Sequence, residues 1–219
     1  MSLIELHHVD LGHGSHIVLP DLSLTIRRGE RVALLGRSGV GKSTLLEMLR
    51  QQLANQVAWC PQADSLVPTL SAYHNIYMGR LEQFSRWRNV INLLRPFKQP
   101  WQDINALGAE LGLEEVMRRQ VDQLSGGQRQ RVAIARALYQ NKPTFVGDEP
   151  VASVDPHQGA RLIELIHTRH ETTIVALHQR ELALAHFERI IGLDAGRIVI
   201  DAPSHTLDPD TLDALYQTV

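Results

Sequence analysis

The strongest constraint on this chain is a glycine-rich segment between a predicted strand and a predicted helix. Arg31–Leu35 is a short apolar run typical of a buried strand, and residues 43–49 continue with good helix formers in a helical apolar pattern. Residues 36–44 read GRSGVGKST, which fits the pattern GxxxxGK[ST]. A strand, a glycine loop and a helix in this order predict a phosphate-binding loop in an α/β protein.

The residue types of this loop suit a nucleotide. Glycines let backbone N–H groups curl around phosphate oxygens, and the N-terminus of the following helix adds a favourable dipole. Lys42 is expected to reach the β- and γ-phosphates, and the Ser43 hydroxyl to ligate Mg²⁺. A glycine-rich turn with a chance lysine is the alternative, and the strand and helix on either side disfavour it. The expected ATP-binding residues are Gly36, Arg37, Ser38, Gly39, Val40, Gly41, Lys42, Ser43 and Thr44.

Two carboxylates follow another apolar run. Residues 145–150 read FVGDEP, so Asp148 and Glu149 emerge at the C-terminal end of a predicted buried strand, where parallel sheets bind ligands. We expect Asp148 to hold Mg²⁺ and Glu149 to polarise the attacking water as a general base. An Asp-Glu pair before proline is by itself more often a solvated turn, so its weight comes from the other motifs.

A third motif, LSGGQ, occupies residues 124–128 before a predicted helix over residues 129–139. Ser125 is predicted to cap that helix, and a serine with two glycines at a helix N-terminus forms a second anion site. A capping serine beside a flexible turn would have the same sequence. The residues alone leave both interpretations open.

These motifs, with His178 after the apolar residues 173–177, resemble an ABC ATPase over almost the whole chain. The resemblance implies an α/β P-loop NTPase with an ABC-type ATPase core. We expect one domain over residues 1–219, with a helical subdomain inserted at about 64–138 and a reduced antiparallel β subdomain. The implied reaction is hydrolysis of ATP to ADP and phosphate with Mg²⁺.

The resemblance also implies roles for single residues. Gln62 matches the glutamine that senses the metal and the nucleophilic water, so it joins Ser43 and Asp148 as a Mg²⁺ contact. His178 matches the histidine that contacts the γ-phosphate. The predicted catalytic residues are therefore Glu149, His178, Gln62 and Lys42.

Dimerisation is a further implication of the resemblance. The LSGGQ residues Ser125, Gly126, Gly127 and Gln128 would bind the nucleotide of the opposite subunit, and Ser153 and Asp155 would lie in a loop that crosses the interface. Two copies, or this chain and a paired ABC ATPase subunit, would then enclose two ATP molecules.

Two features depart from the family pattern. His13 stands where an adenine-stacking aromatic is expected, and imidazole offers a smaller stacking face than tyrosine. Between Thr44 and Gln62 there is room for only one helix and one strand, which is why the β subdomain is expected to be reduced.

Composition limits the possible partners. The chain has 219 residues, a formal net charge of −2 and a single cysteine, which predict no nucleic-acid partner and no disulfide framework. Its eleven histidines form no convincing metal set. We expect a cytosolic protein, since the sequence shows no membrane-spanning run and no signal sequence.

One cluster of cations and aromatics lies in the predicted helical subdomain. Contact with a membrane partner or lipid headgroups is favoured over single-stranded nucleic acid, and a solvated helix face is the alternative. Arg80 is expected to dock a permease, unless it forms an intramolecular salt bridge. The cluster is Arg80, Arg86, Trp87, Arg88, Arg95, Phe97 and Lys98.

The apolar patterns predict most of the remaining elements. Early strands are expected at residues 3–7 and 17–26, and helical pieces at 89–94 and 106–118. Strands and helices then alternate at 144–147, 156–168, 173–177 and 181–186, followed by a hairpin of 189–193 with 197–200 and a closing helix at 208–217.

A narrower resemblance, to phosphonate-importer ATPases, rests on residues 74–81, 148–156 and 189–199. It implies the ATPase subunit of a bacterial importer, bound through an integral membrane permease to the cytoplasmic face of the inner membrane. A periplasmic or extracellular solute-binding protein would be an indirect partner. The alternatives are a non-transport ABC ATPase that is a scaffold or regulator in phosphonate metabolism, and an importer ATPase for another small solute.

Overall fold

The computed structural model describes residues 1–62, 65–213 and 215–216, with the side chain of His13 left out. The chain forms two compact units. The first contains Met1–Trp59 and Lys142–Val219, and the second contains Cys60–Asn141. The predicted helical insertion at about 64–138 falls within the range of the second unit.

A six-stranded sheet forms the centre of the first unit. Its order is β4-β5-β6-β3-β7-β8. Strand β6 pairs in parallel with both β5 and β3, β3 pairs in parallel with β7, and β7 pairs antiparallel with β8. The bounds are β3 Arg31–Leu35, β4 Val57–Cys60, β5 Thr144–Asp148, β6 Thr172–Ala176, β7 Arg189–Asp194 and β8 Arg197–Pro203.

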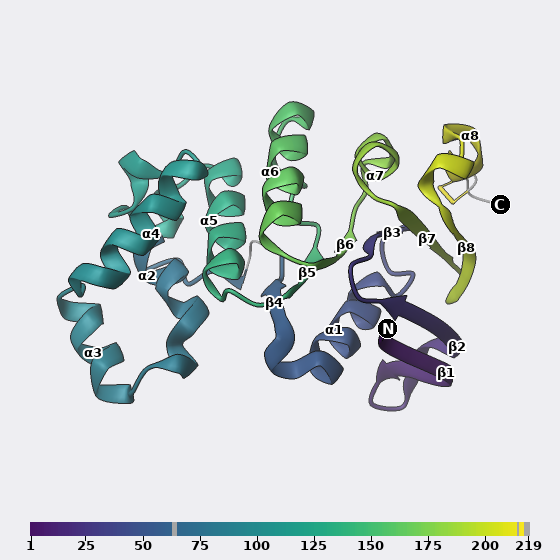
Figure 1. The fold of residues 1–219 in the computed structure, drawn as a ribbon, viewed down its shortest axis with the longest axis horizontal. Coiled ribbons are helices and arrows are strands. Elements are labelled where there is room, and N and C mark those ends of the chain that lie inside the picture. The colour runs from purple at the N-terminus through teal and green to yellow at the C-terminus, as the bar shows by residue number, and fades with distance from the viewer. Residues whose placement is uncertain (63–64, 214, 217–219) are drawn as a thin grey trace. The chain divides into compact units, whose positions relative to one another are not determined.

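Helices cover both faces of this sheet. Figure 1 shows α1 (Lys42–Leu53) on one side, and α6 (Pro156–Arg169) and α7 (Arg180–His186) on the other. Helix α6 begins where the Asp155 side chain accepts a hydrogen bond from the Gln158 backbone N–H, and Pro156 occupies its first turn. The short helix α8 spans Pro209–Asp213. This layering is the α/β architecture that the sequence predicted.

A two-stranded antiparallel sheet packs against α1. It consists of β1 (Ser2–His13) and β2 (His16–Arg27), whose buried leucines and isoleucines join the same core as α1. Between α1 and Gln62 the described chain holds a 3₁₀ turn and β4 only. The predicted single helix and single strand in this interval, and hence the reduced β subdomain, are confirmed.

The predicted hairpin after β7 is also present. Ala195 and Gly196 both have positive φ angles, 43° and 75°, which is the backbone that a two-residue hairpin turn needs. The predicted closing helix is described only over Pro209–Asp213, and part of residues 214–217 lies outside the described chain.

The second unit is helical. The helix predicted over residues 106–118 is wrong in its second half, because α4 ends at Glu110. Gly112 follows with φ of 61°, and the Leu113 N–H donates to the Gly108 carbonyl, which is the glycine termination of a Schellman motif. The helices are α2 Ala72–Tyr77, α3 Arg86–Leu94, α4 Lys98–Glu110 and α5 Gly126–Tyr139.

Arg80 is half-buried and makes contacts within this unit. Its guanidinium lies over the Tyr139 ring, 4.3 Å from the centroid, and its Nε donates to the Tyr139 carbonyl oxygen. The side chain is therefore held against α5, and docking of a permease at Arg80 stays a prediction. Its intramolecular partners are an aromatic ring and a carbonyl, where the sequence-based alternative was a salt bridge.

Within the described ranges, none of the helices combines the length and apolar character needed to cross a membrane.

Candidate nucleotide-binding site

The ends of three parallel strands meet at one edge of the central sheet. In the register of the sheet, Ala176 of β6 lies opposite both Leu34 of β3 and Asp148 of β5. The connection continues past the strands, because the Leu177 N–H donates to the Leu34 carbonyl and the Glu149 N–H donates to the Ala176 carbonyl. The predicted phosphate loop, the two carboxylates and His178 therefore leave the sheet together.

The phosphate loop needs glycine at two positions. Gly36 has φ of 143°, and a Cβ there would lie 2.3 Å from the Leu193 carbonyl oxygen. Gly41 has φ of 108° at the N-cap of α1, and a Cβ there would collide with Leu19. L-residues rarely adopt these angles, so the loop conformation follows directly from the glycines.

Lys42 is enclosed by the loop that precedes it. The side chain is only 5% exposed, and its Nζ donates to the carbonyl oxygens of Gly36 at 2.7 Å and Arg37 at 3.1 Å. Burial lowers the pKa of Lys42, while the charges of Glu149 and Asp148 act in the opposite direction. A cation is thus fixed where the loop would receive phosphate oxygens.

The rest of the predicted loop is accessible. Arg37, Ser38, Gly39 and Ser43 are exposed, whereas Val40 and Thr44 are half-buried. An exposed Ser43 hydroxyl at the start of α1 is available to a bound ligand.

Asp148 carries a buried oxygen in need of a partner. The residue is 6% exposed, and its Oδ1 has no hydrogen-bond partner among the described residues. A buried carboxylate oxygen is unfavourable without a donor or a cation. Hard oxygen donors suit Mg²⁺, which usually takes one or two protein ligands together with substrate phosphates. Asp148 and Ser43 therefore fit a phosphate-bound Mg²⁺, and no cluster of three or more His, Cys, Asp or Glu in the described chain offers an all-protein metal site.

Glu149 and His178 form a close pair. The Glu149 Oε1 lies 2.5 Å from the His178 Nε2, and both residues line a cavity of about 100 Å³ with Val151, Ala152, Leu177 and Gln179. Glu149 has φ of 52°, in the left-handed region, which is uncommon for a residue with a side chain. Such strain costs roughly 1–3 kcal/mol and gathers at functional sites. No property of the sequence predicted this conformation.

Tyr216 is a site residue that sequence reasoning missed. Its hydroxyl accepts a hydrogen bond of 3.4 Å from the Gly36 N–H, and the Arg180 guanidinium lies 5.6 Å from its ring centroid. Arg180 also pairs with Asp213. The C-terminal segment therefore contacts both the first glycine of the phosphate loop and the start of α7, two residues beyond His178. An aromatic near a chain end carries no signal that would have revealed this contact.

The remaining predicted residues of the first unit lie before α6. Asp155 is exposed and caps the helix through a 3.0 Å hydrogen bond from the Gln158 N–H, and Ser153 is exposed. His13 ends β1, but its side chain lies outside the described part of the chain, so base stacking stays a prediction.

The LSGGQ motif begins α5 in the second unit. Ser125 Oγ accepts a hydrogen bond from the Gln128 N–H, and Gln128 Oε1 accepts one from the Ser125 N–H, which is a complete capping box. Gly126 and Gly127 form the first turn of the helix. Gln62 is exposed in the same unit, and its carbonyl accepts a hydrogen bond from the Ser65 N–H. The capping interpretation of Ser125 is therefore correct in this structure, and an anion site at the same turn stays a prediction.

A family comparison agrees with this geometry. Residues 19–152, which include the phosphate loop, the LSGGQ motif and both carboxylates, match the ABC transporter family. The chain belongs to the ABC transporter family. It is an ABC ATPase, and the predicted resemblance is confirmed.

Several curated relatives of this ABC ATPase carry one name. The phosphonates import ATP-binding protein PhnC of Pseudomonas entomophila is 38% identical over 97% of this chain and 91% of its own length. The protein of that name in Pseudomonas putida is 37% identical over 98% of this chain and 90% of its own length. The alignments extend over 242 and 244 positions, more than the 219 residues of this chain, so these relatives contain residues that this ABC ATPase lacks.

Solved ABC structures share the fold. A dimeric post-hydrolysis ATP-binding cassette bound to ADP and Pi superposes with a TM-score of 0.72 and 26% identity, covering 91% of this chain and 98% of that one. A nucleotide-free cassette from an ABC transporter gives a TM-score of 0.77 at 18% identity, with both chains covered completely.

Proposed function

We propose that this ABC ATPase is the ATP-hydrolysing subunit of a bacterial phosphonate importer. The observation that supports this cargo is the 38% identity with a phosphonates import protein over 97% of the chain. Phosphonate or a related phosphorus oxyanion would be carried by a separate permease, because no helix among the described residues could cross a membrane. Residues 1–219 would act as one ABC ATPase domain, with Cys60–Asn141 as its helical subdomain.

Binding of ATP would depend on the phosphate loop. Residues 36–44 would surround the phosphates with backbone N–H groups, and Lys42 would exchange its carbonyl partners for β- and γ-phosphate oxygens. Ser43, Asp148 and Gln62 would hold Mg²⁺, and the orphaned Asp148 Oδ1 supports this assignment. When bound, Mg²⁺ would offset negative charge on the phosphates.

Hydrolysis would use the Glu149–His178 pair. Glu149 as a carboxylate accepts a hydrogen bond from a water and takes its proton as the water attacks the γ-phosphate. His178 lies against the Glu149 carboxylate, so it can orient the base, and its ring is sufficiently exposed to meet a phosphate. The strained backbone at Glu149 supports a functional position.

A homodimer, or a pair with another ABC ATPase subunit, would complete each site. Ser125, Gly126, Gly127 and Gln128 at the start of α5 would meet the nucleotide of the opposite subunit, where helix N-terminal N–H groups favour anions. The exposed Ser153 and Asp155 would lie at the interface. The dimeric cassette with 26% identity supports this arrangement.

Transport would require further partners. The dimer would bind permease subunits at the cytoplasmic face of the cell membrane, and a solute-binding protein would deliver the cargo to the permease. Nucleic acid is not an expected partner, since the net charge of −2 provides no basic footprint.

Reconstitution with its own permease and solute-binding protein tests this function. ATP hydrolysis by the assembled complex should rise when a phosphonate is supplied, and a sulfonate of the same shape is the matched control. If a different solute stimulates ATP hydrolysis, phosphonate is refuted as the cargo, but the role as an importer ATPase is not. Failure of the chain to join any permease would instead favour a scaffold or regulator in phosphonate metabolism.

A further inference from the structure

Helix α3 in the second unit is built with its polar side inward. Asn92 is fully buried and Asn89 is half-buried, although asparagine is normally a surface residue. Asn92 Oδ1 accepts hydrogen bonds from the Tyr73 hydroxyl at 3.1 Å and the Phe97 N–H at 3.0 Å. These bonds attach α3 to the unit through amides instead of through aliphatic packing.

A second set of bonds fixes the rotation of the helix. Asn89 Oδ1 accepts from the Tyr77 hydroxyl at 3.0 Å, and its Nδ2 donates to the Leu81 carbonyl at the same distance. Turning α3 to bury its aliphatic side chains would break all four bonds and leave two tyrosine hydroxyls without their acceptors. The orientation is thus specified by the sequence and is not a loosely packed surface.

The opposite face of α3 is apolar and exposed. Trp87 is 79% and Leu94 is 83% exposed, and three further aliphatic side chains are about half exposed. At 100° per residue these positions fall within one sector of the helix of about 160°, which also includes Arg86 beside Leu93. Such a stripe normally faces a protein core, and a contiguous apolar surface of this kind marks an interaction site. The residues are Trp87, Val90, Ile91, Leu93 and Leu94.

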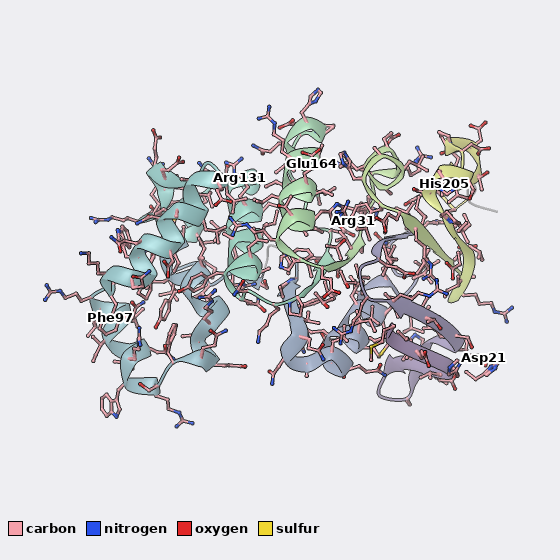
Figure 2. The ribbon with its side chains drawn as sticks, viewed as in Figure 1. Asp21, Arg31, Phe97, Arg131, Glu164 and His205 are labelled. Carbon is pink, nitrogen blue, oxygen red and sulfur yellow. The ribbon has the colours of Figure 1, made fainter. Side chains whose placement is uncertain are left out.

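Cations surround this stripe. Arg86 and Arg88 lie in α3, Arg95 follows it, and Lys98 begins α4, whereas no acidic residue occurs from position 83 to position 102. The Arg88 guanidinium is held over the rings of Phe84 and Phe97, at 4.6 and 5.4 Å from their centroids. Figure 2 labels Phe97 at the junction of α3 and α4.

A wide cavity continues the same surface. It has a volume of about 910 Å³ and is lined within the second unit by Ile91, Arg95, Phe97, Lys98 and Trp101, among others. The aliphatic stripe and Trp87 therefore lie in a segment that contains cations and no acidic residue, and no Asp or Glu is among the described residues that line the cavity.

We propose that the exposed face of α3 binds the surface of an anionic lipid bilayer. The aliphatic side chains and Trp87 would enter the boundary between headgroups and acyl chains, and the cations would contact lipid phosphates. Lipid is the occupant that the charges favour, since an excess of cations without acids matches an anionic surface. This inference does not depend on the identity of the cargo.

Vesicle flotation with the full-length protein tests the proposal. The protein should float with vesicles of phosphatidylglycerol and phosphatidylethanolamine, and remain unbound with phosphatidylcholine alone. Leu94→Asp should weaken binding by about tenfold or more, because it removes an aliphatic side chain that would enter the bilayer boundary and adds an anion. Arg95→Glu should weaken binding to the anionic vesicles. It should also make the remaining binding less sensitive to salt, because a cation that would contact lipid phosphates is lost.

Val199→Asp is the matched control. Val199 is an aliphatic residue that is 54% exposed on β8, so its substitution adds the same charge to a different surface. Vesicle binding should be unchanged in this variant. ATP hydrolysis measured without vesicles should be unchanged in all three variants, Leu94→Asp, Arg95→Glu and Val199→Asp.

Three results would overturn the proposal. Wild-type protein that does not bind anionic vesicles would refute it directly. Equal losses in Leu94→Asp and Val199→Asp would show that the binding is unrelated to α3. Vesicle binding that survives Leu94→Asp, together with lost co-purification of a permease, would assign the stripe to a protein partner instead.

Discussion

The carboxylate of Glu149 and the imidazole of His178 lie in direct contact, with 2.5 Å between Oε1 and Nε2. They follow the adjacent strands β5 and β6, whose register aligns Asp148 with Ala176. The contact gives His178 a way to set the orientation of the proposed general base before a nucleotide binds.

His178→Ala should therefore reduce turnover more than affinity. Without the imidazole the Glu149 carboxylate loses a fixed partner, and we expect kcat to fall on the order of 10²-fold. The KM for ATP should change by less than about threefold, because the phosphate loop is untouched. Steady-state kinetics separate the two parameters. His186→Ala is a control histidine at the end of α7, and it should leave kcat unchanged. A large rise in KM with normal kcat would contradict the positioning role.

Lys42→Met should act mainly on binding. The substitution keeps the length of a side chain that is 5% exposed but removes the cation aimed at the phosphates. Hydrogen bonds to charged groups contribute about 1.5–3 kcal/mol, so ATP affinity should fall roughly 10- to 100-fold. Titration calorimetry measures this directly. Lys142→Met, in a half-buried lysine before β5, should bind ATP normally. Unchanged affinity in Lys42→Met would place the phosphates elsewhere.

Tyr216→Phe should weaken the phosphate loop slightly. The change removes the acceptor of the Gly36 N–H and keeps the ring beside Arg180. A single hydrogen bond contributes about 0.5–1.5 kcal/mol, so ATP affinity should fall by up to about tenfold. Tyr77→Phe removes the hydroxyl bond to Asn89 in the second unit and should lower thermal stability without changing ATP affinity. If the two variants bind ATP equally, the C-terminal segment has no part in shaping the loop.

His167 should make the fold sensitive to mild acid. Burial, together with nearby Arg31, His186 and His170, lowers the pKa of His167 from 6.5 to about 4. Between these values the unfolded chain binds the proton and the folded chain does not. The contribution to stability is therefore complete above pH 6.5 and is lost as the pH falls towards 4, by up to about 3 kcal/mol.

Urea unfolding of His167→Leu against wild type measures this contribution. The wild-type free energy of unfolding should drop more steeply between pH 6.5 and pH 4, while the variant loses that component of the slope. The imidazole meets the Phe187 ring edge-on, so leucine keeps the apolar contact. Parallel curves for the two proteins would mean that folding does not lower the pKa of His167.

Apolar runs and glycine spacing predicted the central sheet because these signals depend only on residues that are close in the sequence. The strand before Gly36 and the strand before Asp148 are both buried and continuous, so their ends could be located without the fold. The helix predicted over residues 106–118 ends early because Gly112, with its positive φ, terminates it although the apolar pattern continues.

Long-range contacts explain most of what the sequence did not reveal. The Tyr216 hydroxyl reaches Gly36 across 180 positions of the chain, and no pattern of neighbours encodes that pairing. The orientation of α3 is similarly set by Tyr73 and Tyr77 from another helix, which outweigh the aliphatic stripe. Glu149, with its left-handed backbone, also makes a contact outside its own strand, since its N–H donates to the Ala176 carbonyl in the neighbouring strand.

Phosphate release by Glu149→Gln, measured with ATP-dependent dimerisation on the same samples, tests the central claim most directly. The amide keeps the shape of the side chain and removes the base, so turnover should fall on the order of 10²-fold or more while ATP binding persists. Because ATP would no longer be consumed, a closed dimer should accumulate in the presence of ATP and Mg²⁺. Turnover close to that of the wild type would contradict the assignment of Glu149 as the catalytic base of this ABC ATPase.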